Sequence, residues 1–254
     1  MSVFGWIPDL PDPKDFSFDT LLQGLSKKIK LTPGDIDLRP YTTNTNQYDS
    51  NSCTGTATAD SVEILNALVG NPRVELSRLF VYSMARILHQ ELDKDEGCYI
   101  RTCFKVLSTF GVCEEKYWPY NTKKVHVSPS LIAQRQALGH KIHSFYRIKS
   151  TGQKRVDAVQ KALRMKHPVV FGTKVSNSFS DVTHFSPISE PTKNIGGGHA
   201  MIIVGILGSN FIVKNSYGKE WGQNGFWLMT PSYLAWDKTH DLWVPTLGSV
   251  FTSG

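Results

Sequence analysis

Apolar residues up to about position 165 recur with the period of an α-helix. The first such stretch starts at Cys53 and is closed by a Gly-Asn-Pro turn at 70–72. Its apolar positions are Ala57, Val62, Ile64, Leu65 and Leu68. The same period predicts further helices at 77–90, 100–110, 129–138 and 156–165.

Beyond Pro168 the pattern changes to short apolar runs bounded by Gly, Asn or Pro. These runs predict β-strands at 169–171, 200–207, 211–213 and 226–229. A helical part followed by a strand-rich part predicts an α+β protein of two lobes. We expect an N-terminal arm at 1–34, a helical lobe at 35–145 and a β-rich lobe at 146–254.

The arm at 1–34 is punctuated by prolines and carries scattered apolar side chains. Burial of one large apolar side chain contributes about 1.5 to 3 kcal/mol, so a groove of the body is expected to take them up. The residues concerned are Trp6, Ile7, Leu10, Phe16 and Phe18. Two placements fit: the arm partly covers the cleft between the lobes, or it staples the lobes together from behind.

Length and composition describe an ordinary globular protein. The chain has 254 residues, of which 40% are hydrophobic and 20% charged, enough for a sizeable core. Its longest apolar run, 200–207, is far shorter than the roughly 20 residues that span a bilayer, so no membrane partner is expected. The N-terminus lacks the basic and apolar regions of a secretory signal. We therefore expect a cytoplasmic protein, or one exported by a route without a signal peptide.

The net charge of +6 does not indicate a nucleic-acid partner. The basic clusters at 27–30 and 123–124 are short and lack interleaved aromatic residues. There is no glycine-rich phosphate loop and no Cys-x2-Cys pair, so neither a cofactor nor a metal site is expected. Cys98, Cys103 and Cys113 form an odd set of thiols, which argues against a disulfide framework.

Four polar residues in three separate motifs suit one kind of chemistry. A thiol nucleophile needs a base, the base needs an orienting group, and an oxyanion needs a hydrogen-bond donor. The residues that supply these roles, in that order, are Cys53, His199, Asn215 and Gln47. A single cysteine is more often a small buried hydrophobic residue. Cys53, however, opens a helix, where the first-turn N–H groups and the helix dipole favour a thiolate.

The spacing of these motifs resembles that of the papain-like cysteine peptidases. Gln47 precedes Cys53 by six residues, and Asn215 lies in an Asn-Ser-aromatic-Gly-x-x-Trp-Gly run after His199. The separation of the cysteine and the histidine matches a known property of that family. The resemblance covers about residues 35–245. The segment 5–12, together with the departures described below, is similar to a bacterial branch of the family.

The resemblance implies a two-lobed papain-like fold with the cleft between the lobes. It also implies a cysteine peptidase that hydrolyses peptide bonds through a thioester acyl-enzyme on Cys53. In this reading Asn215 fixes the imidazole of His199. Gln47 and the backbone N–H of Cys53 form the oxyanion hole.

The same resemblance implies the residues that bind the substrate, an extended polypeptide. Gly97 and Cys98 match the place where the family pairs its backbone with the substrate by strand addition, although the family has glycine at the second position. Gly198 lets the substrate approach the histidine, and Trp221 matches an aromatic platform on the leaving-group side. The chain is expected to be a monomer.

Departures from the family pattern leave every catalytic atom in place. Ser50 stands where enzymes of secretory compartments usually carry a cysteine, and Tyr217 replaces a tryptophan. Two alternative functions use the same residues. One is a non-hydrolytic papain-like protein that only binds peptides, and the other is an amidase or peptide ligase.

Overall fold

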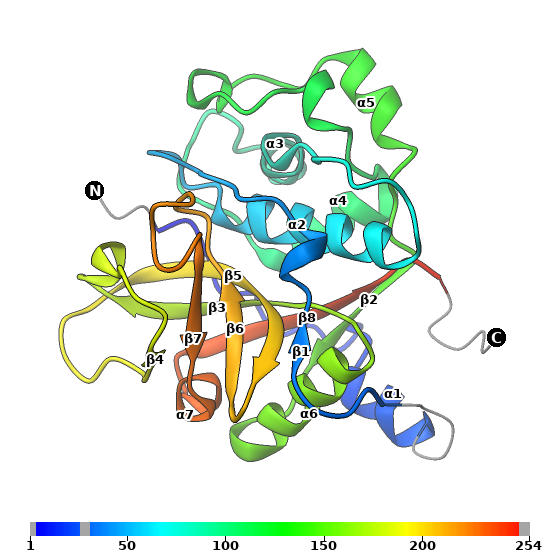
Figure 1. Ribbon diagram of the computed structural model, residues 1–254. Coiled ribbons are helices and arrows are strands. Elements are labelled where there is room, and N and C mark those ends of the chain that lie inside the picture. The colour runs from blue at the N-terminus through cyan, green and yellow to red at the C-terminus, as the bar shows by residue number, and fades with distance from the viewer. Residues whose placement is uncertain (1–3, 26–30, 249–254) are drawn as a thin grey trace.

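The computed structural model describes residues 4–25 and 31–248. A group of helices lies above a large sheet (Figure 1). These helices are α2 (Cys53–Leu68), α3 (Arg78–Leu88), α4 (Ile100–Thr109) and α5 (Leu131–Ala137). Each matches a segment whose apolar period predicts a helix, so these four predictions are confirmed.

The sheet has the strand order β2-β8-β3-β5-β6-β7-β4, and β1 pairs with β5. Its strands are β1 (Ile36–Asp37), β2 (Ser144–Ile148), β3 (Val169–Ser176), β4 (Pro187–Ile188), β5 (Ile195–Leu207), β6 (Asn210–Lys214), β7 (Phe226–Met229) and β8 (Thr239–Thr246). The β4–β7 pair is parallel and the other pairs are antiparallel. Below the sheet lie α6 (Gly152–Arg164), which the apolar period predicts, and the short α7 (Pro231–Ala235) (Figure 1). The α+β class is confirmed.

Short 3-10 helices lie in the connections, at Arg39–Tyr41, Glu115–Tyr117, Thr122–Lys124 and Phe179–Asp181. The strands β2 and β8 were not predicted. In β8 the polar residues His240 and Asp241 interrupt the apolar pattern, and Asp241 has a φ of 51°, outside the β region. The partly exposed β2 shows no clean alternation of buried and exposed positions.

The helix α2 is the centre of the packing. All residues from Cys53 to Leu65 are buried, which explains why small side chains occupy every face of the helix. A Cβ atom on Gly55 would lie 2.7 Å from the Cβ of Tyr82, so glycine lets α3 approach closely. On another side α2 contacts β5. This contact places the first turn of α2 against the strand that carries His199.

A buried ion pair joins α2 to β6. Lys214 Nζ contacts Asp60 Oδ2 and donates a hydrogen bond of 2.8 Å to Thr45 Oγ1. The Lys214 and Asp60 side chains are only 1% and 3% exposed. Glu63 lies one turn further along α2, and burial with the Asp60 charge raises its pKa to about 8. Since Asn215 follows Lys214, the pair ties the segment that carries Asn215 to α2, the helix that begins at Cys53.

The N-terminal arm does not bury all of its apolar residues. Trp6 is 5% exposed and Phe18, at the start of α1 (Phe18–Leu25), is fully buried. Leu10 and Phe16, however, are 73% and 68% exposed, so their expected burial is wrong. Both lie in a stretch that polar contacts hold to the body, as described below. The boundaries of the arm and the two lobes stay predictions.

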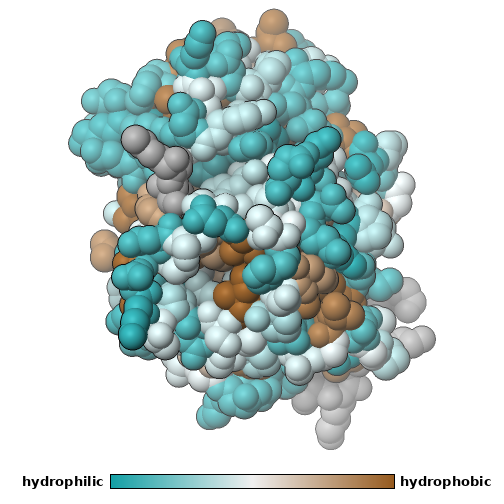
Figure 2. All heavy atoms as spheres, turned by 60° about the vertical axis from the view of Figure 1, so that its left-hand side comes forward, coloured by the Kyte–Doolittle hydropathy of each residue, from teal (hydrophilic) through white to brown (hydrophobic). Residues whose placement is uncertain are grey.

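Figure 2 shows a face on which hydrophilic residues cover the upper half, whereas hydrophobic residues gather in one patch of the lower half. Within the parts of the chain that the structure describes, no helix is both long and apolar enough to span a membrane. The basic cluster at 27–30 lies outside the described residues. Lys124, from the other cluster, lies 4.9 Å from the centre of the Trp118 ring.

Candidate active site

The thiol of Cys53 lies where α2 meets β5. Cys53 is the first residue of α2, and its own backbone N–H and that of Thr54 are directed to the sulfur. On the opposite side, the backbone N–H of Ala200 in β5 donates to Cys53 Sγ at 3.4 Å. Ala200 follows His199 directly, so the packing of α2 on β5 brings the thiol and the imidazole segment together.

His199 and Asn215 form a hydrogen-bonded pair. The distance from His199 Nε2 to Asn215 Oδ1 is 2.7 Å, and both residues are buried. Asn215 Oδ1 also accepts from the backbone N–H of Ser216 at 2.7 Å, so the oxygen of the amide faces the imidazole. An oxygen acceptor requires the imidazole proton on Nε2. Among the described residues, His199 Nδ1 has no hydrogen-bond partner, and it is left as the nitrogen that can take up a proton.

An aromatic cluster covers this pair. The Tyr217 ring lies 4.9 Å from the imidazole of His199 at an interplanar angle of 33°. Trp221 packs edge-on against Tyr217 at 5.9 Å, and its Nε1 donates to the carbonyl of Phe179 at 2.9 Å. Trp221 is 5% exposed, so here it supports Tyr217 from inside. Its expected contact with the leaving group stays a prediction.

Hydrogen bonds hold the side chain of Gln47 beside the loop that precedes Cys53. Its Nε2 donates to the carbonyl of Ser50 at 2.8 Å, and its Oε1 accepts from the hydroxyl of Ser216. The second N–H of the Gln47 amide is therefore not used by these bonds. Sequence reasoning missed the part of Tyr120, whose hydroxyl donates to the Gln47 carbonyl at 2.8 Å and lies 2.7 Å from Ser52 Oγ.

The remaining predicted site residues hold the N-terminal arm. The backbone N–H of Cys98 donates to the carbonyl of Gly5 at 2.9 Å, and the Cys98 carbonyl accepts from Ile7 N–H at 3.1 Å. Across the cleft, the carbonyl of Gly198 accepts from Trp6 N–H at 3.2 Å. Trp6 runs parallel to the Cys98 segment. The arm thus covers Cys53 and pairs with the same backbone groups, those of Cys98 and Gly198, that were predicted to bind substrate.

Gly5 lies over the Cys53 thiol. Its carbonyl accepts from the backbone N–H of Cys98, and its own backbone N–H is one of the groups that lower the pKa of the thiol. Gly97 also has to be a glycine. Its φ is +96°, and a Cβ atom there would lie 2.2 Å from the Gly5 carbonyl oxygen.

Under the arm, both members of the Cys53 and His199 pair are pushed towards their neutral forms. Burial raises the pKa of the Cys53 thiol to about 11, against the opposing effect of the surrounding backbone N–H groups. Burial lowers the pKa of His199 to about 4, although the hydrogen bond that its Nε2–H donates to Asn215 Oδ1 works in the other direction. The thiolate expected from the helix start is therefore not favoured while the arm covers the site, because desolvation outweighs the first-turn N–H groups.

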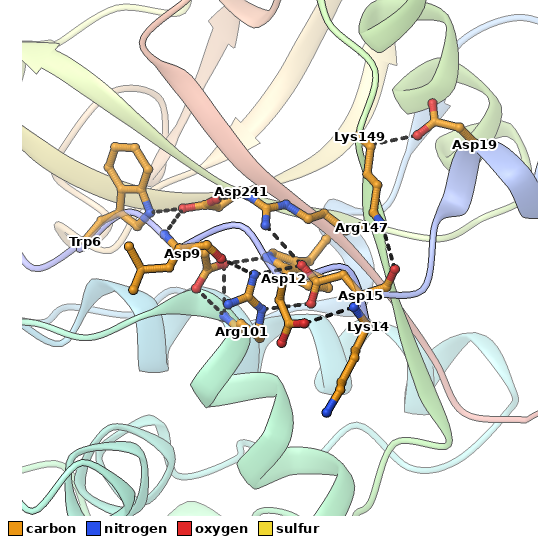
Figure 3. A network of polar contacts seen from close by, with 12 residues as sticks. Trp6, Asp9, Asp12, Lys14, Asp15, Asp19, Arg101, Arg147, Lys149 and Asp241 are labelled. Carbon is orange, nitrogen blue, oxygen red and sulfur yellow. Dashed lines mark hydrogen bonds and ion pairs between the residues drawn. The ribbon is translucent and has the colours of Figure 1, made fainter.

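The arm is anchored to both sides of the cleft by acidic residues (Figure 3). The carboxylate of Asp15 binds Arg101 of α4 at 2.7 Å and Arg147 of β2 at 3.1 Å. Asp9 accepts from Trp243 Nε1 at 2.9 Å and from the backbone N–H of Arg101. The arm therefore both covers the cleft and joins the helical layer to the sheet. Sequence reasoning found the arm's apolar residues but not these aspartates.

No group of three or more His, Cys, Asp or Glu residues that could hold a metal occurs in residues 4–25 and 31–248. All four cysteines are free and buried. The site as described is a cysteine, an imidazole and two amide side chains, covered by a segment of the same chain.

This arrangement, on an α+β fold, defines a cysteine protease of the papain type. The family model described as papain family cysteine protease matches residues 32–235, most of the chain but not the arm. The chain therefore belongs to the papain family of cysteine proteases and is an enzyme, with polypeptides as its substrate class.

Individual relatives agree with this assignment. An uncharacterized peptidase C1-like protein of Acanthamoeba polyphaga mimivirus is 33% identical over 95% of this chain and 86% of its own length. The crystal structure of xylellain, a cysteine protease from Xylella fastidiosa, matches 97% of both chains with 29% identity and a TM-score of 0.85. Bromelain from Ananas comosus has 20% identity and a TM-score of 0.66 over 85% of this chain, which shows the shared fold.

Proposed function

We propose that this enzyme hydrolyses peptide bonds through a thioester acyl-enzyme formed on Cys53. The observation that carries the proposal is the 2.7 Å bond between His199 Nε2 and Asn215 Oδ1. This bond leaves Nδ1 of the imidazole free, and the next residue of the same strand touches the Cys53 sulfur.

In the proposed reaction His199 Nδ1 takes the proton of the Cys53 thiol, and the sulfur attacks the carbonyl carbon of the peptide bond. The imidazolium then returns the proton to the leaving amine, and the thioester remains. Water, deprotonated by the same imidazole, hydrolyses the thioester and restores the thiol. Asn215 keeps the second imidazole proton on Nε2 throughout both steps.

The oxyanion that forms at each attack needs donors. The Gln47 amide has one N–H that its bonds to Ser50 and Ser216 do not use, and Cys53 is the first residue of α2, where a backbone N–H has no acceptor within the helix. We assign these two groups to the oxyanion hole. The bonds to Ser50 and Ser216 fix the Gln47 amide before the substrate arrives, which is what makes such a donor effective.

The arm makes the chain as described a blocked enzyme. A substrate must place a carbonyl carbon on the sulfur, whereas the arm places Gly5 over the sulfur and commits the Gly5 carbonyl to the backbone N–H of Cys98. The arm therefore occupies the cleft without being cut. Activity requires segment 4–9 to leave the cleft, so that an extended polypeptide can pair with Cys98 instead.

The test compares two full-length variants on a peptide library, with products identified by mass spectrometry. Gly5→Val displaces the arm because a side chain at position 5 would overlap the Asn51 backbone. We expect cleavage by Gly5→Val and none by the Gly5→Val, Cys53→Ala double variant. Cleavage by the double variant would exclude Cys53 as nucleophile. Peptide binding without cleavage by Gly5→Val would favour the non-hydrolytic alternative, and transfer of the acyl group to added amines in place of water would favour a ligase.

A further inference from the structure

The hydroxyl of Tyr120 belongs to a cluster of three hydroxyl groups in the loop 47–52, which leads into α2. It lies 2.5 Å from Ser50 Oγ and 2.7 Å from Ser52 Oγ, and these two oxygens are 2.8 Å apart. It also donates a hydrogen bond of 2.8 Å to the backbone carbonyl of Gln47. Ser50 and Ser52 are 1% and 0% exposed. One hydroxyl from outside the loop therefore contacts the loop at three buried positions.

Tyr120 itself is held by groups outside this loop. Its backbone N–H donates to Glu115 Oε1 at 2.5 Å. The guanidinium carbon of Arg78, in α3, lies 4.4 Å from the centre of the Tyr120 ring. The Arg78 side chain is 8% exposed, and α3 packs on α2. The hydroxyl of Tyr120 is thus a fixed point against which the loop rests.

The three contacts span both groups that we assign to the oxyanion hole. Gln47, at one end of the loop, carries the side-chain amide. Ser52, at the other end, shares a planar peptide group with the backbone N–H of Cys53. Among the described residues, the hydrogen bonds within the loop join the two ends only through Ser50. Tyr120 contacts both ends directly, so it sets how far apart the two donors lie.

Tyr120 can do this without touching the reacting atoms. Its hydroxyl has a carbonyl and two serine hydroxyls of the loop as partners, and none of its hydrogen bonds goes to Cys53 or His199 within the described residues. Burial raises the pKa of this hydroxyl, although its bonds to Ser50 and Ser52 act in the other direction. The group therefore stays neutral and keeps the proton that it donates to the Gln47 carbonyl.

We propose that Tyr120 is a positioning residue, whose hydroxyl fixes the distance between the Gln47 amide and the backbone N–H of Cys53 so that both donors reach one oxyanion. This inference rests on the peptidase function and the oxyanion hole proposed above. It concerns only steps in which a carbonyl oxygen becomes an oxyanion. Alkylation of Cys53 by iodoacetamide forms a bond from sulfur to a saturated carbon and releases iodide, so it does not need the two donors.

The experiment removes only the hydroxyl, by Tyr120→Phe in the full-length Gly5→Val chain. We expect kcat for a peptide substrate to fall at least about tenfold, because a displacement of about 1 Å in an active site can cost about 100-fold. KM and the rate of iodoacetamide alkylation at Cys53 should each change less than about twofold, because neither involves an oxyanion.

Tyr233→Phe is the matched control. The Tyr233 hydroxyl donates to the carbonyl of Lys174 at 2.7 Å, and the residue is 1% exposed, so this variant also loses a buried hydrogen bond to a backbone carbonyl. Its kcat should stay unchanged. Gln47→Ala provides a second comparison, because Tyr120→Phe should cost much less once the amide that it positions is absent.

A peptide aldehyde tests the hole without hydrolysis. The Cys53 sulfur adds to the aldehyde carbon, and the carbonyl electron pair moves to the oxygen that the two donors bind. We expect Tyr120→Phe to raise the Kd of the aldehyde at least about tenfold, and Tyr233→Phe to leave it unchanged. Weaker aldehyde binding in a chain that cleaves no peptide would refute the peptidase function and support the positioning role.

Three results would overturn the proposal. They are an unchanged kcat and aldehyde Kd in Tyr120→Phe, an equal loss of kcat with and without Gln47, and a loss of alkylation rate as large as the loss of kcat. If Tyr120→Phe does not fold, Ser52→Ala takes its place with the same expectations. Ser52 makes no side-chain capping bond to α2, so this variant removes one contact of the cluster and no helix cap.

Discussion

Gly5 lies against Asn51 so closely that a Cβ atom on Gly5 would be 1.8 Å from the Asn51 carbonyl oxygen. Cβ atoms do not approach backbone oxygens to that distance, so only glycine fits at this point of the arm. Gly5 is also the residue of the arm that lies over the Cys53 thiol. The fit of the arm over the nucleophile therefore depends on the absence of one carbon atom.

Gly5→Val should open the cleft by displacing segment 4–9, while Asp15 keeps the following part of the arm attached to Arg101 and Arg147. We expect iodoacetamide to alkylate Cys53 at least about tenfold faster than in the unchanged chain, because the thiol is fully buried under the arm. Peptide mapping by mass spectrometry gives the rate. Gly24→Val is the control, since among the described residues no atom outside the chain neighbours and backbone of α1 lies within 4 Å of a Cβ at that position. Equal rates for the two variants would mean that the arm does not protect the thiol.

The arm should bind less tightly as the pH rises. Burial, followed by the charge of Asp241, raises the pKa of Asp9 to about 7 in the docked arm. In a released arm the carboxyl has a pKa of about 3.9. The docked arm therefore holds a proton on Asp9 that the released arm loses. The free energy that this difference contributes to docking is fully present below about pH 4 and is lost as the pH rises to about 7.

The measurement is the alkylation rate of Cys53 in the unchanged chain divided by that in Gly5→Val, which cancels the ionisation of the thiol itself. We expect this ratio to rise at least about tenfold between pH 5 and pH 8. Asp9→Asn should flatten the profile, because it removes the titrating group. A ratio that falls over this range would show that another group controls docking.

Gln47→Ala should be folded and impaired. Loss of one oxyanion donor is expected to lower kcat by about 100-fold or more, measured in the Gly5→Val background. Asn215→Ala should also be impaired, because the imidazole of His199 loses the acceptor that fixes its proton. Gln136→Ala, an exposed glutamine of α5, is the control. A Gln47→Ala enzyme with unchanged kcat/KM would place the residue outside the oxyanion hole.

Lys214→Met should strongly destabilise the fold. It leaves the Asp60 carboxylate buried without its partner, which typically costs about 3 to 5 kcal/mol. Urea unfolding gives the free energy, and Lys238→Met, which breaks only an exposed contact with Asp237, is the comparison. Equal unfolding free energies for the two variants would show that the Asp60 charge finds another partner.

Reductant should leave the melting temperature unchanged. Cys53, Cys98, Cys103 and Cys113 are all free. At the place where related enzymes of secretory compartments usually have a cysteine, the hydroxyl of Ser50 instead bonds Ser52 Oγ at 2.8 Å and contacts Tyr120. A drop of several degrees with reductant would reveal a disulfide that contributes to stability.

The sequence predicted the helices around the site better than the strands at its back. The helix from Cys53 was predicted from apolar residues at helical spacing between Ala57 and Leu68, and β5 from an apolar run interrupted only by Gly205, which reflects the burial of its residues from Gly198 to Ile206. In β8, by contrast, Asp241 is buried through hydrogen bonds and not through hydrophobicity. Such a residue looks like part of a loop until its partners are known.

The candidate site shows the same division. Cys53 and His199, which we propose to act by their own chemistry, stand in local motifs that a sequence displays. Trp6 and Asp241 are separated by 235 residues, and only the folded chain brings them together. The placement of Gly5 over the thiol left no trace in the sequence beyond a proline-rich arm with scattered apolar residues.

Because Asp15 and the cleft-covering segment belong to the same chain, the blocking segment is a tethered ligand with a fixed effective concentration. For short tethers this concentration is on the order of millimolar. Dilution of the protein therefore does not activate it, and a peptide or inhibitor binds with its own affinity reduced by the fraction of molecules whose cleft is open. The measured affinity of a cleft ligand will therefore depend on how tightly the arm is docked as well as on the contacts of the ligand with the cleft. To measure the contacts alone, the ion pairs of Asp15 with Arg101 and Arg147 must first be broken.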